Sequence, residues 1–375
     1  MKIKNFGVEI WMNETENHCE YNLAETCVDS LTVEELLDLA GKKDALLDEI
    51  LPMRLSYGAI EGSDRLRDVI ASLYRNQSRE NIVITHGAIG ANMLVHASLV
   101  SPGDRVISVV PTYQQHYSIP ESFGADIQLL QLHEENGFLP DLAELQSLVN
   151  DNTRLICITN PNNPTGALID ESMLLQIADI ARRCDAHILC DEVYRGTDQQ
   201  GDGMTASMAD LYEKGISTAS MSKAYSLAGL RLGWIAGPRE LLEAVSIHRD
   251  YNTISVGMID DHLASIALEN SEAILNRSRE ITRNNLAVLD AWVENEPLIS
   301  YVKPQSGTTA LLKYDVDMSS RKFCLKLLAE TGVLFTPGSA MEMEGYLRIG
   351  YANHPDILKK GLQRVSGFLQ RLGSE

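Results

Sequence analysis

Two cations stand eight residues apart in the segment SMSKAYSLAGLRLGW (residues 220–234), and no carboxylate lies between them. Lys223 stands among small residues and a tyrosine, and Arg231 directly precedes an apolar run. Exposure on the surface is the usual fate of a single lysine. In a partly desolvated pocket, however, a lysine has a lowered pKa and becomes a nucleophile toward a carbonyl group. The setting of Lys223 predicts such a pocket.

A glycine loop, THGAIGAN (residues 85–92), follows an apolar run and leads into a helical pattern. Backbone N–H groups at the start of a helix bind anions. With the hydroxyl of Ser220 and the guanidinium of Arg231, the loop could bind a phosphate, which would explain an arginine without a nearby carboxylate. The alternative is a plain strand-to-helix turn, and the loop alone does not separate the two.

Asp191 ends the apolar run AHILCDEVY (residues 186–194). A buried carboxylate needs a cationic or hydrogen-bonding partner. A ligand with an aldehyde, a phosphate and a ring nitrogen would satisfy Lys223, Arg231 and Asp191 together. Pyridoxal 5′-phosphate is such a ligand.

The elements that position these groups are apolar runs alternating with helical patterns. We expect strands near 81–87, 104–113, 153–159 and 186–194, and helices over 31–50, 60–74, 141–149 and 171–184. The runs are apolar throughout, which is typical of a parallel sheet covered on both faces. The polar motifs follow the strands, and open α/β sheets bind ligands at the carboxyl ends of their strands.

The chain has 375 residues, more than one hydrophobic core usually contains. Beyond about residue 270 a long polar helix leads to a compact αβ tail, which we interpret as a smaller domain that the N-terminal segment joins. The predicted organisation has a large domain at 46–270, a small domain at 1–30 and 285–375, and connecting helices at 31–45 and 271–284.

The composition excludes several classes of partner. With 32 basic and 52 acidic residues the net charge is −20, which argues against nucleic acid and anionic membranes. No apolar run has transmembrane length, and MKIKNFGVEIWMNE lacks the apolar core of a signal peptide. The six cysteines show no metal-binding spacing. We therefore expect a cytoplasmic protein with reduced thiols and no metal.

Between about residues 50 and 355 the sequence resembles the class I/II aminotransferase family, which is fold type I of the pyridoxal-phosphate-dependent enzymes (the aspartate aminotransferase superfamily). Seven motifs occur in the family's order: YGAIEG, THGAIGAN, PGD…PTY, NPNNPTG, DEVY, SMSKAYSLAGLRLGW and YLRIGYAN. The resemblance implies an α/β fold, with a mostly parallel seven-stranded sheet sandwiched by helices and a smaller α+β domain.

The resemblance also implies a role for each matching residue. Lys223 holds pyridoxal phosphate as an internal aldimine and shuttles a proton, and Asp191 pairs with the pyridine nitrogen. Tyr194 and Asn163 bind the 3′ oxygen of the ring, and Tyr113 stacks on the ring. By the same resemblance, Lys223, Asp191 and Tyr194 are the catalytic residues.

The family's phosphate cup maps onto Gly87, Ala88, Ile89, Ser220, Ser222 and Arg231. Many relatives have a hydroxyl residue where this chain has alanine and isoleucine, so contact there rests on backbone N–H groups. Tyr57 matches a tyrosine that reaches the phosphate from the other subunit, which implies a homodimer. Arg348, with Asn163, matches the group that binds the substrate α-carboxylate.

The implied function is transfer of an amino group between an α-amino acid and a 2-oxo acid (EC 2.6.1.-). A lyase, cyclase or dehydratase on the same scaffold is the alternative, because such enzymes share the cofactor site. A non-catalytic regulatory domain is disfavoured by the acidic chain without a DNA-binding segment. The stretch NLAETCVDSLT lacks the family's glycine-proline substrate loop, and no second arginine predicts a preference for aspartate.

Overall fold

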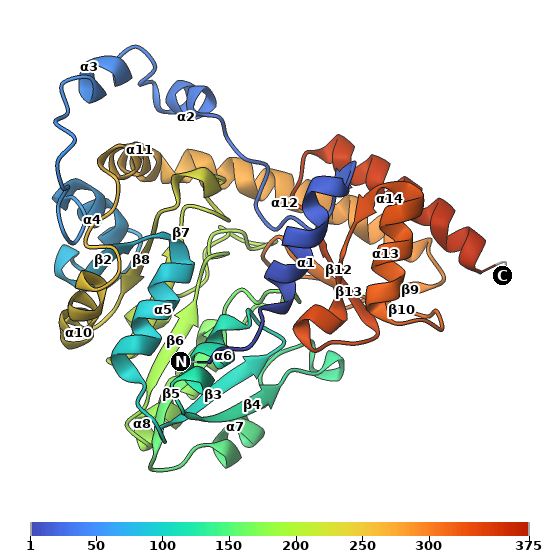
Figure 1. Cartoon of the computed structure of the whole chain (residues 1–375), viewed down its shortest axis with the longest axis horizontal. Coiled ribbons are helices and arrows are strands. Elements are labelled where there is room, and N and C mark those ends of the chain that lie inside the picture. Colours follow the sequence, from blue (N-terminus) through green and yellow to red (C-terminus); the bar gives the residue numbers. More distant parts are fainter. Residues whose placement is uncertain (1, 374–375) are drawn as a thin grey trace.

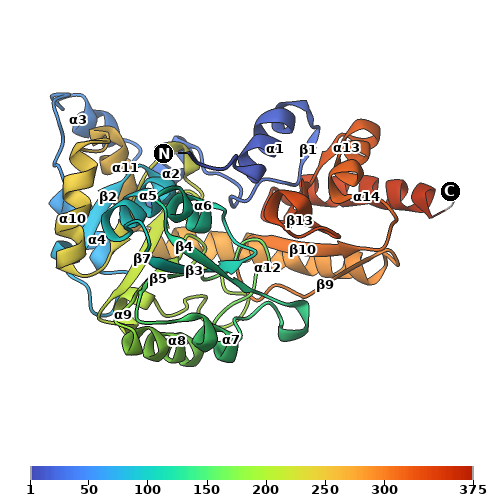
Figure 2. The ribbon, with the colours of Figure 1, turned by 60° about the horizontal axis from the view of Figure 1, so that its bottom comes forward.

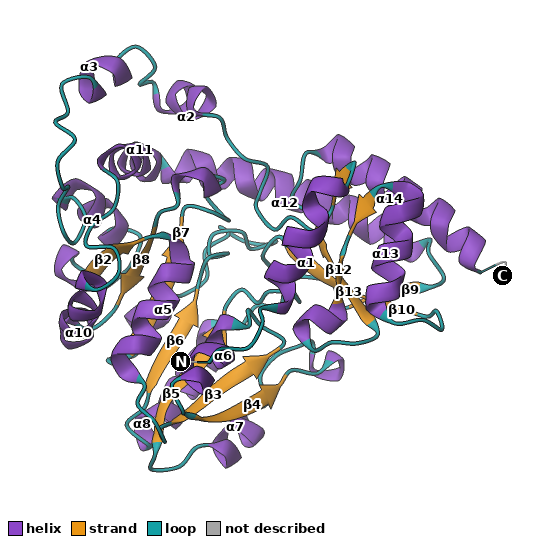
Figure 3. Cartoon of the chain, viewed as in Figure 1, coloured by secondary structure: helices purple, strands orange, loops and turns teal. Residues whose placement is uncertain are grey.

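A seven-stranded sheet forms the centre of the larger part of the molecule (Figures 1 and 3). The structure is a computed structural model and describes residues 2–373. The strand order is β2 (Ile82–Thr85), β8 (Gly233–Ala236), β7 (Gly215–Ser220), β6 (His187–Asp191), β5 (Thr153–Thr159), β3 (Arg105–Val110) and β4 (Asp126–Gln131). Only β8 runs antiparallel to its neighbours within this sheet. The predicted α/β fold with a mostly parallel seven-stranded sheet is confirmed.

Both faces of this sheet are buried, which explains why its strands are apolar throughout. Val106 and Leu155 pack toward α5 (Gly87–Leu99) and α10 (Arg239–Asp250) on one face. Their neighbours Ile107 and Ile156 pack toward α7 (Leu142–Leu148) and α8 (Glu171–Arg183) on the other. Alternate residues of one strand thus serve two cores.

Further helices surround the sheet or extend from it: α2 (Val33–Ala40), α3 (Leu46–Ile50), α4 (Asp64–Ala71), α6 (Gln115–Ser122), α9 (Met208–Leu211) and α11 (Met258–Glu269). The helical segment expected over 31–50 is interrupted. Gly41, at φ 63°, ends α2 in the left-handed conformation that glycine adopts without steric cost. At its other end, Thr32 and Glu35 form a capping box.

The second part of the molecule is built on a four-stranded antiparallel sheet. Its order is β12 (Thr336–Pro337), β13 (Tyr346–Gly350), β10 (Thr309–Tyr314) and β9 (Ile299–Tyr301), with α13 (Ser320–Thr331) and α14 (Pro355–Leu372) packed beside it. The N-terminal helix α1 (Gly7–Thr15) lies next to this sheet (Figures 1 and 2). Trp11 Nε1 donates to the carbonyl of Phe335 at 2.9 Å.

The N-terminal segment is also joined to this part through its backbone. Strand β1 (Tyr21–Asn22) pairs in parallel with β11 (Val333–Leu334). The 24-residue helix α12 (Ser271–Glu294) runs from the larger part to the smaller one (Figure 2). The division of the chain into two domains, with the limits given above, stays a prediction. Within residues 2–373 no helix combines the length and apolarity needed to cross a membrane.

Candidate active site

A cavity of about 370 Å³ lies between the carboxyl ends of the central strands and the N-terminal segment. One side, which we call the strand-end wall, contains Ala88, Ile89, Asn92, Tyr113, Asn163, Asp191, Tyr194, Ser220, Ser222, Lys223 and Arg231. The opposite side, the N-terminal wall, contains Val8, Glu9, Met12, Glu16 and Ala24–Cys27. Arg348, from β13, completes the lining. Most residues predicted from the sequence thus meet at one place.

Two predicted residues lie outside this lining. Gly87 precedes Ala88 and contacts the cavity through Arg231, whose Nη2 lies 3.1 Å from the position that a Cβ on Gly87 would take. Tyr57 is 77% exposed in the loop between α3 and α4. Within the described chain, therefore, Tyr57 serves no part of its own subunit's cavity.

Asp191 is held by groups that sequence reasoning missed. Its Oδ2 accepts from Asn92 Nδ2 at 3.0 Å and lies 3.3 Å from His116 Nε2, and its Oδ1 accepts from the backbone N–H of Val193. Thr218 Oγ1 donates in turn to Asn92 at 2.7 Å. Asn92 ends the THGAIGAN motif, so its place one turn into α5 was the available signal. The network fixes the carboxylate at the strand end.

Lys223 reaches across the cavity to the N-terminal wall. Its Nζ donates to Thr26 Oγ1 at 2.6 Å and lies 3.5 Å from Cys27 Sγ. Burial lowers the pKa of Lys223, but its acidic neighbours Cys27, Tyr194 and Glu25 outweigh burial and raise the pKa above its ordinary value. The lowered pKa expected from the sequence is therefore wrong for the free amine. The N-terminal segment supplies Glu25, Thr26 and Cys27, and the local sequence does not predict where this segment lies.

The glycine loop THGAIGAN packs so closely against β8 that a side chain at Gly233 would not fit. A Cβ on Gly233 would lie 2.5 Å from the carbonyl carbon of Gly87 and 2.6 Å from the nitrogen of Ala88. Glycine in β8 therefore lets the start of α5 approach the strand. Arg231 has φ 50°, and its Nη1 donates to the carbonyl of Ala228 at 2.9 Å. The rest of the guanidinium faces the loop where an anion would bind.

Arg348 is buried, with 3% of its surface exposed. Its Nη1 donates to Asn163 Oδ1 at 3.4 Å, and its Nη2 donates to the carbonyl of Ala24 at 3.3 Å. Burial lowers the pKa of this guanidinium. Its Nε lies buried without a hydrogen-bond partner. A buried, incompletely satisfied arginine is suited to a carboxylate ligand.

Three buried ligand-type groups come together behind the strand-end wall, although their sequence spacing gives no metal motif. The donor atoms of His96, His116 and Cys157 lie within 4.8 Å of one another. Burial raises the pKa of the Cys157 thiol and lowers the pKa of His96. Both shifts favour neutral groups packed behind Asp191, and a metal would require the thiolate.

The cavity fits pyridoxal phosphate in its charges. Among residues 2–373, no carboxylate lies within ion-pair distance (4.0 Å) of Lys223, Arg231 or Arg348. These cations line one cavity, with an amine for an aldehyde and a guanidinium beside a helix N-terminus for a phosphate. Asp191, at the end of β6, suits a protonated ring nitrogen.

Comparisons with known proteins agree with this geometry. The model of the family "Aminotransferase class I and II" matches residues 29–362. A crystal structure of a PLP-dependent aminotransferase from Streptococcus suis 89-1591 is 45% identical, with a TM-score of 0.96 over 99% of both chains. Capreomycidine synthase from Streptomyces vinaceus is 30% identical over 96% of this chain and 92% of its own.

A third relative shares the fold at lower identity. The crystal structure of the PLP-dependent cyclase OrfR is 23% identical, with a TM-score of 0.90 over 99% of this chain and 98% of that one. The matched residues include the sheet, the strand-end wall with Lys223, and Arg348, and they begin after the N-terminal wall. The chain belongs to the aminotransferase class I and II family, and the protein is a pyridoxal-phosphate-dependent aminotransferase.

Proposed function

We propose that Lys223 is the residue of this aminotransferase that holds the cofactor covalently and moves the proton at the α-carbon of the substrate. The observation that carries this role is the position of Nζ, inside the cavity and 2.6 Å from a hydroxyl. When bound, pyridoxal phosphate supplies the electron sink for the carbanion. The amine is close enough to donate and accept protons within the same cavity.

The other residues divide the work of binding. Asp191 keeps the ring nitrogen protonated, Tyr194 and Asn163 bind the ring oxygen, and Tyr113 lies along the ring. Arg231, Ser220, Ser222 and the backbone of Gly87, Ala88 and Ile89 bind the phosphate. Arg348, with Asn163, binds the α-carboxylate of an amino acid or a 2-oxo acid. These residues line one cavity, except Gly87, which adjoins it beside Arg231, and this common place supports the assignments.

The test is a single-turnover screen of amino acids against the purified holoenzyme. Absorbance reports conversion of the bound cofactor to its pyridoxamine form, and the released 2-oxo acid is quantified. We expect one 2-oxo acid for each cofactor converted, and regeneration of the cofactor by an added 2-oxo acid. If no amino acid in the screen converts the cofactor, transamination is contradicted.

A cyclase or lyase is the second candidate, because relatives named capreomycidine synthase and PLP-dependent cyclase share nearly the whole chain. Such an enzyme would consume its amino acid catalytically without leaving the pyridoxamine form. A lyase would release ammonia and a 2-oxo acid together, and a cyclase would release neither. The same screen, with ammonia measured, separates the candidates.

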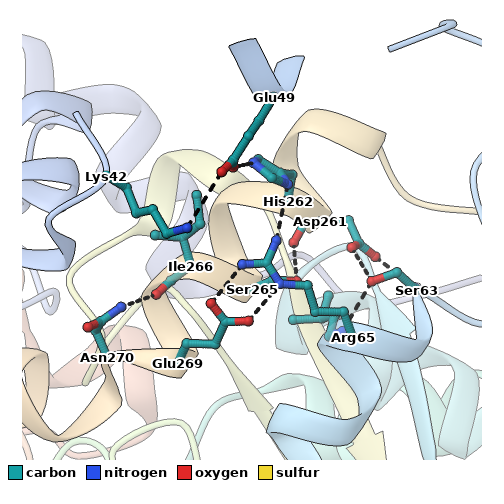
Figure 4. A network of polar contacts seen from close by, with 11 residues as sticks. Lys42, Glu49, Ser63, Arg65, Asp261, His262, Ser265, Ile266, Glu269 and Asn270 are labelled. Carbon is teal, nitrogen blue, oxygen red and sulfur yellow. Dashed lines mark hydrogen bonds and ion pairs between the residues drawn. The ribbon is translucent and has the colours of Figure 1, made fainter. Parts of the chain in front are cut away.

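We also propose a homodimer whose phosphate cup is completed by Tyr57 of the second subunit. The arm before α4 carries exposed apolar side chains, namely Leu47 (60%), Leu51 (76%), Leu55 (76%) and Tyr57 (77%). Two contacts attach the arm to α11: Glu49 Oε2 lies 2.8 Å from His262 Nε2, and the N–H of Ser63 donates to Asp261 at 2.9 Å (Figure 4). An attached apolar arm suits a second copy.

Mixed dimers test the shared site. Tyr57→Ala in one chain is combined with Lys223→Ala in the other, and each variant is inactive or weak by itself. If sites are shared, one site of the mixed dimer carries both defects and the other neither, so activity returns. Verified mixed dimers without recovery would place Tyr57 elsewhere, and a monomer in light scattering would remove the premise.

We propose a cytoplasmic location as well. All six cysteines are unpaired in the structure, which is typical of reducing compartments. Cell fractionation with an antibody against the chain is the direct test.

A further inference from the structure

The N-terminal wall places three carboxylates in the cavity that have no role in cofactor binding. Glu9 and Glu16 lie on one face of α1 and the short 3₁₀ turn after it, together with Val8 and Met12. Glu25 follows β1 and lies deeper in the cavity. Sequence reasoning found none of the three, because no local motif marks them.

The carboxylate of Glu25 is fixed and charged. Its Oε1 accepts the backbone N–H groups of Thr26 at 2.7 Å and Cys27 at 2.9 Å. Burial raises the pKa of Glu25, but the charge of Lys223 and these N–H groups lower it below the ordinary value. Glu9 is half-buried and accepts from the hydroxyl of Tyr113 at 2.8 Å. Glu25 thus holds negative charge against the lining of the cavity, and the carboxylate of Glu9 is fixed at the same lining by Tyr113.

The carboxylates of Glu9, Glu16 and Glu25 form no direct ion pair within the described residues, although Lys223 and Arg348 line the same cavity. Within the described residues, no lysine, arginine or histidine lies within 4.0 Å of Glu9, Glu16 or Glu25. Glu16 is exposed and Glu9 and Glu25 are half-buried, so these carboxylates line the cavity where a cationic ligand group could donate hydrogen bonds to them directly. Arg348, which lines the same cavity, independently indicates a ligand. Only 3% of its surface is exposed, and its Nε is buried without a hydrogen-bond partner.

Arg348 and the three carboxylates would bind opposite ends of one ligand molecule. An α-carboxylate at Arg348 and an α-carbon near Lys223 leave the side chain only the N-terminal wall to follow. Along this wall Val8 and Met12 offer apolar contact for a methylene chain, and the carboxylates lie beside it. An acidic side chain would be repelled, and a neutral one would leave the carboxylates without a partner.

We infer that the amino donor is an α-amino acid whose side chain ends in a cation, an amine or a guanidinium, which Glu9, Glu16 and Glu25 bind. The inference rests on the proposed transamination and adds its substrate class. A cation there makes charge-assisted hydrogen bonds, which are worth about tenfold or more in affinity each.

Matched donors isolate the charge. Arginine is compared with citrulline, and lysine with norleucine, because each pair has a similar length and differs in its terminal charge. We expect kcat/KM of the holoenzyme to favour the cationic member by at least about tenfold. Glutamate should be a poorer donor than either. A preference for neutral or acidic donors would overturn the inference while leaving transamination intact.

Variants then test the residues. Glu25→Gln and Glu9→Gln should each lower the cationic-to-neutral ratio of kcat/KM by about tenfold. Glu14→Gln is the matched control, since Glu14 lies on α1, is exposed and pairs with Arg321 at 2.9 Å outside the cavity. A ratio unchanged in both cavity variants, each with a wild-type urea midpoint, would reject the role. Should one variant fail to fold, the other decides.

A binding measurement keeps the inference separate from turnover. Calorimetric titration of the holoenzyme with arginine and citrulline gives a ratio of Kd values whether or not transfer follows. Tighter binding of arginine, lost in Glu9→Gln, supports the cationic class even if the donor screen fails. Equal Kd values for the two ligands would overturn the inference, whatever the outcome for transamination.

Discussion

The two walls of the cavity differ in how they are held and in what they offer a ligand. The strand-end wall presents Lys223, Arg231 and Asp191, and its carboxylate is fixed by Asn92 and a backbone N–H. The N-terminal wall presents three carboxylates, and it is attached to the smaller part of the molecule through the two-stranded sheet of β1 and β11. One wall is suited to the cofactor and the reaction, and the other to the choice of substrate.

If the proposed roles hold, one cavity separates chemistry from selectivity by chain segment. Changes in the strand-end wall should remove turnover for every donor. Changes in the N-terminal wall should alter the relative kcat/KM values of different donors. The predictions below test this separation, beginning with the largest expected effect.

Lys223→Ala should abolish turnover for all donors, by about 10²–10⁴-fold or more, because it removes both the covalent attachment and the proton transfer. The fold should persist, since the Nζ contacts only a hydroxyl and a thiol. Kinetics with circular dichroism measure both. Lys214→Ala, at the opposite end of the sheet, is the control. Borohydride reduction that labels a lysine other than Lys223 would refute the assignment.

Asp191→Asn should reduce kcat by roughly 150- to 5000-fold, because removing one partner of a buried charge pair costs about 3–5 kcal/mol. The variant should still bind the cofactor through Lys223 and the residues that bind the phosphate. Turnover is measured at saturating pyridoxal phosphate, with Asp185→Asn on the surface as control. Activity within about tenfold of the wild type, or 1.4 kcal/mol, would contradict the role.

Arg348→Lys tests the residue that joins the two walls, since it contacts Asn163 on one and Ala24 on the other. A lysine keeps the charge but loses the planar fork that binds a carboxylate through two hydrogen bonds. We expect kcat/KM to fall about 10–100-fold for cationic and neutral donors alike. Arg321→Lys on α13 should have no such effect. A fall in kcat/KM confined to one class of donor would contradict the proposed division of roles between the two walls.

The smallest expected effect concerns stability behind the strand-end wall. Burial lowers the pKa of His96 well below 6.5, and burial with Arg154 and Lys214 lowers the pKa of His187 to about 4. Below pH 6.5 the unfolded chain therefore binds more protons than the folded one, and stability falls as the pH falls. The loss is at most about 1.4 kcal/mol per pH unit for each group.

Urea unfolding at pH 7.5 and 5.5 measures this loss. The midpoint should drop at pH 5.5 in the wild type, and His96→Leu should reduce the drop. His18→Gln, at an exposed position, should keep it. Equal midpoints at both pH values would show that the buried histidines are not neutral in the folded protein.

The strand-end wall was predictable because its signals are local. Asp191 ends a strand that is apolar throughout, and Lys223 and Arg231 stand between glycines and small residues in the sequence. Parallel strands bring such ends to one edge, so the sheet and its ligand site were inferred together. Seven motifs in order then identified the family.

The N-terminal wall was not predictable because tertiary contacts place it. Glu9, Glu16 and Glu25 stand in a stretch without a motif, and distant contacts such as the pairing of Tyr21 with Val333 and the bond from Trp11 to Phe335 bring them to the cavity. The same contacts overturned the expected pKa of Lys223, since Glu25 and Cys27 lie beside it. Gly41 shows a local miss as well, because a left-handed cap divides the expected helix.

The pairing of β1 with β11 also has a consequence for synthesis. Tyr21 meets Val333 only after the intervening chain has left the ribosome, 312 residues later. At about 5–20 residues per second this takes about 15–60 s. The central sheet ends with β8 at Ala236, so its strands are all available well before then. A nascent chain can therefore build the cofactor side of its cavity while the part that selects a substrate still waits for its partner strand.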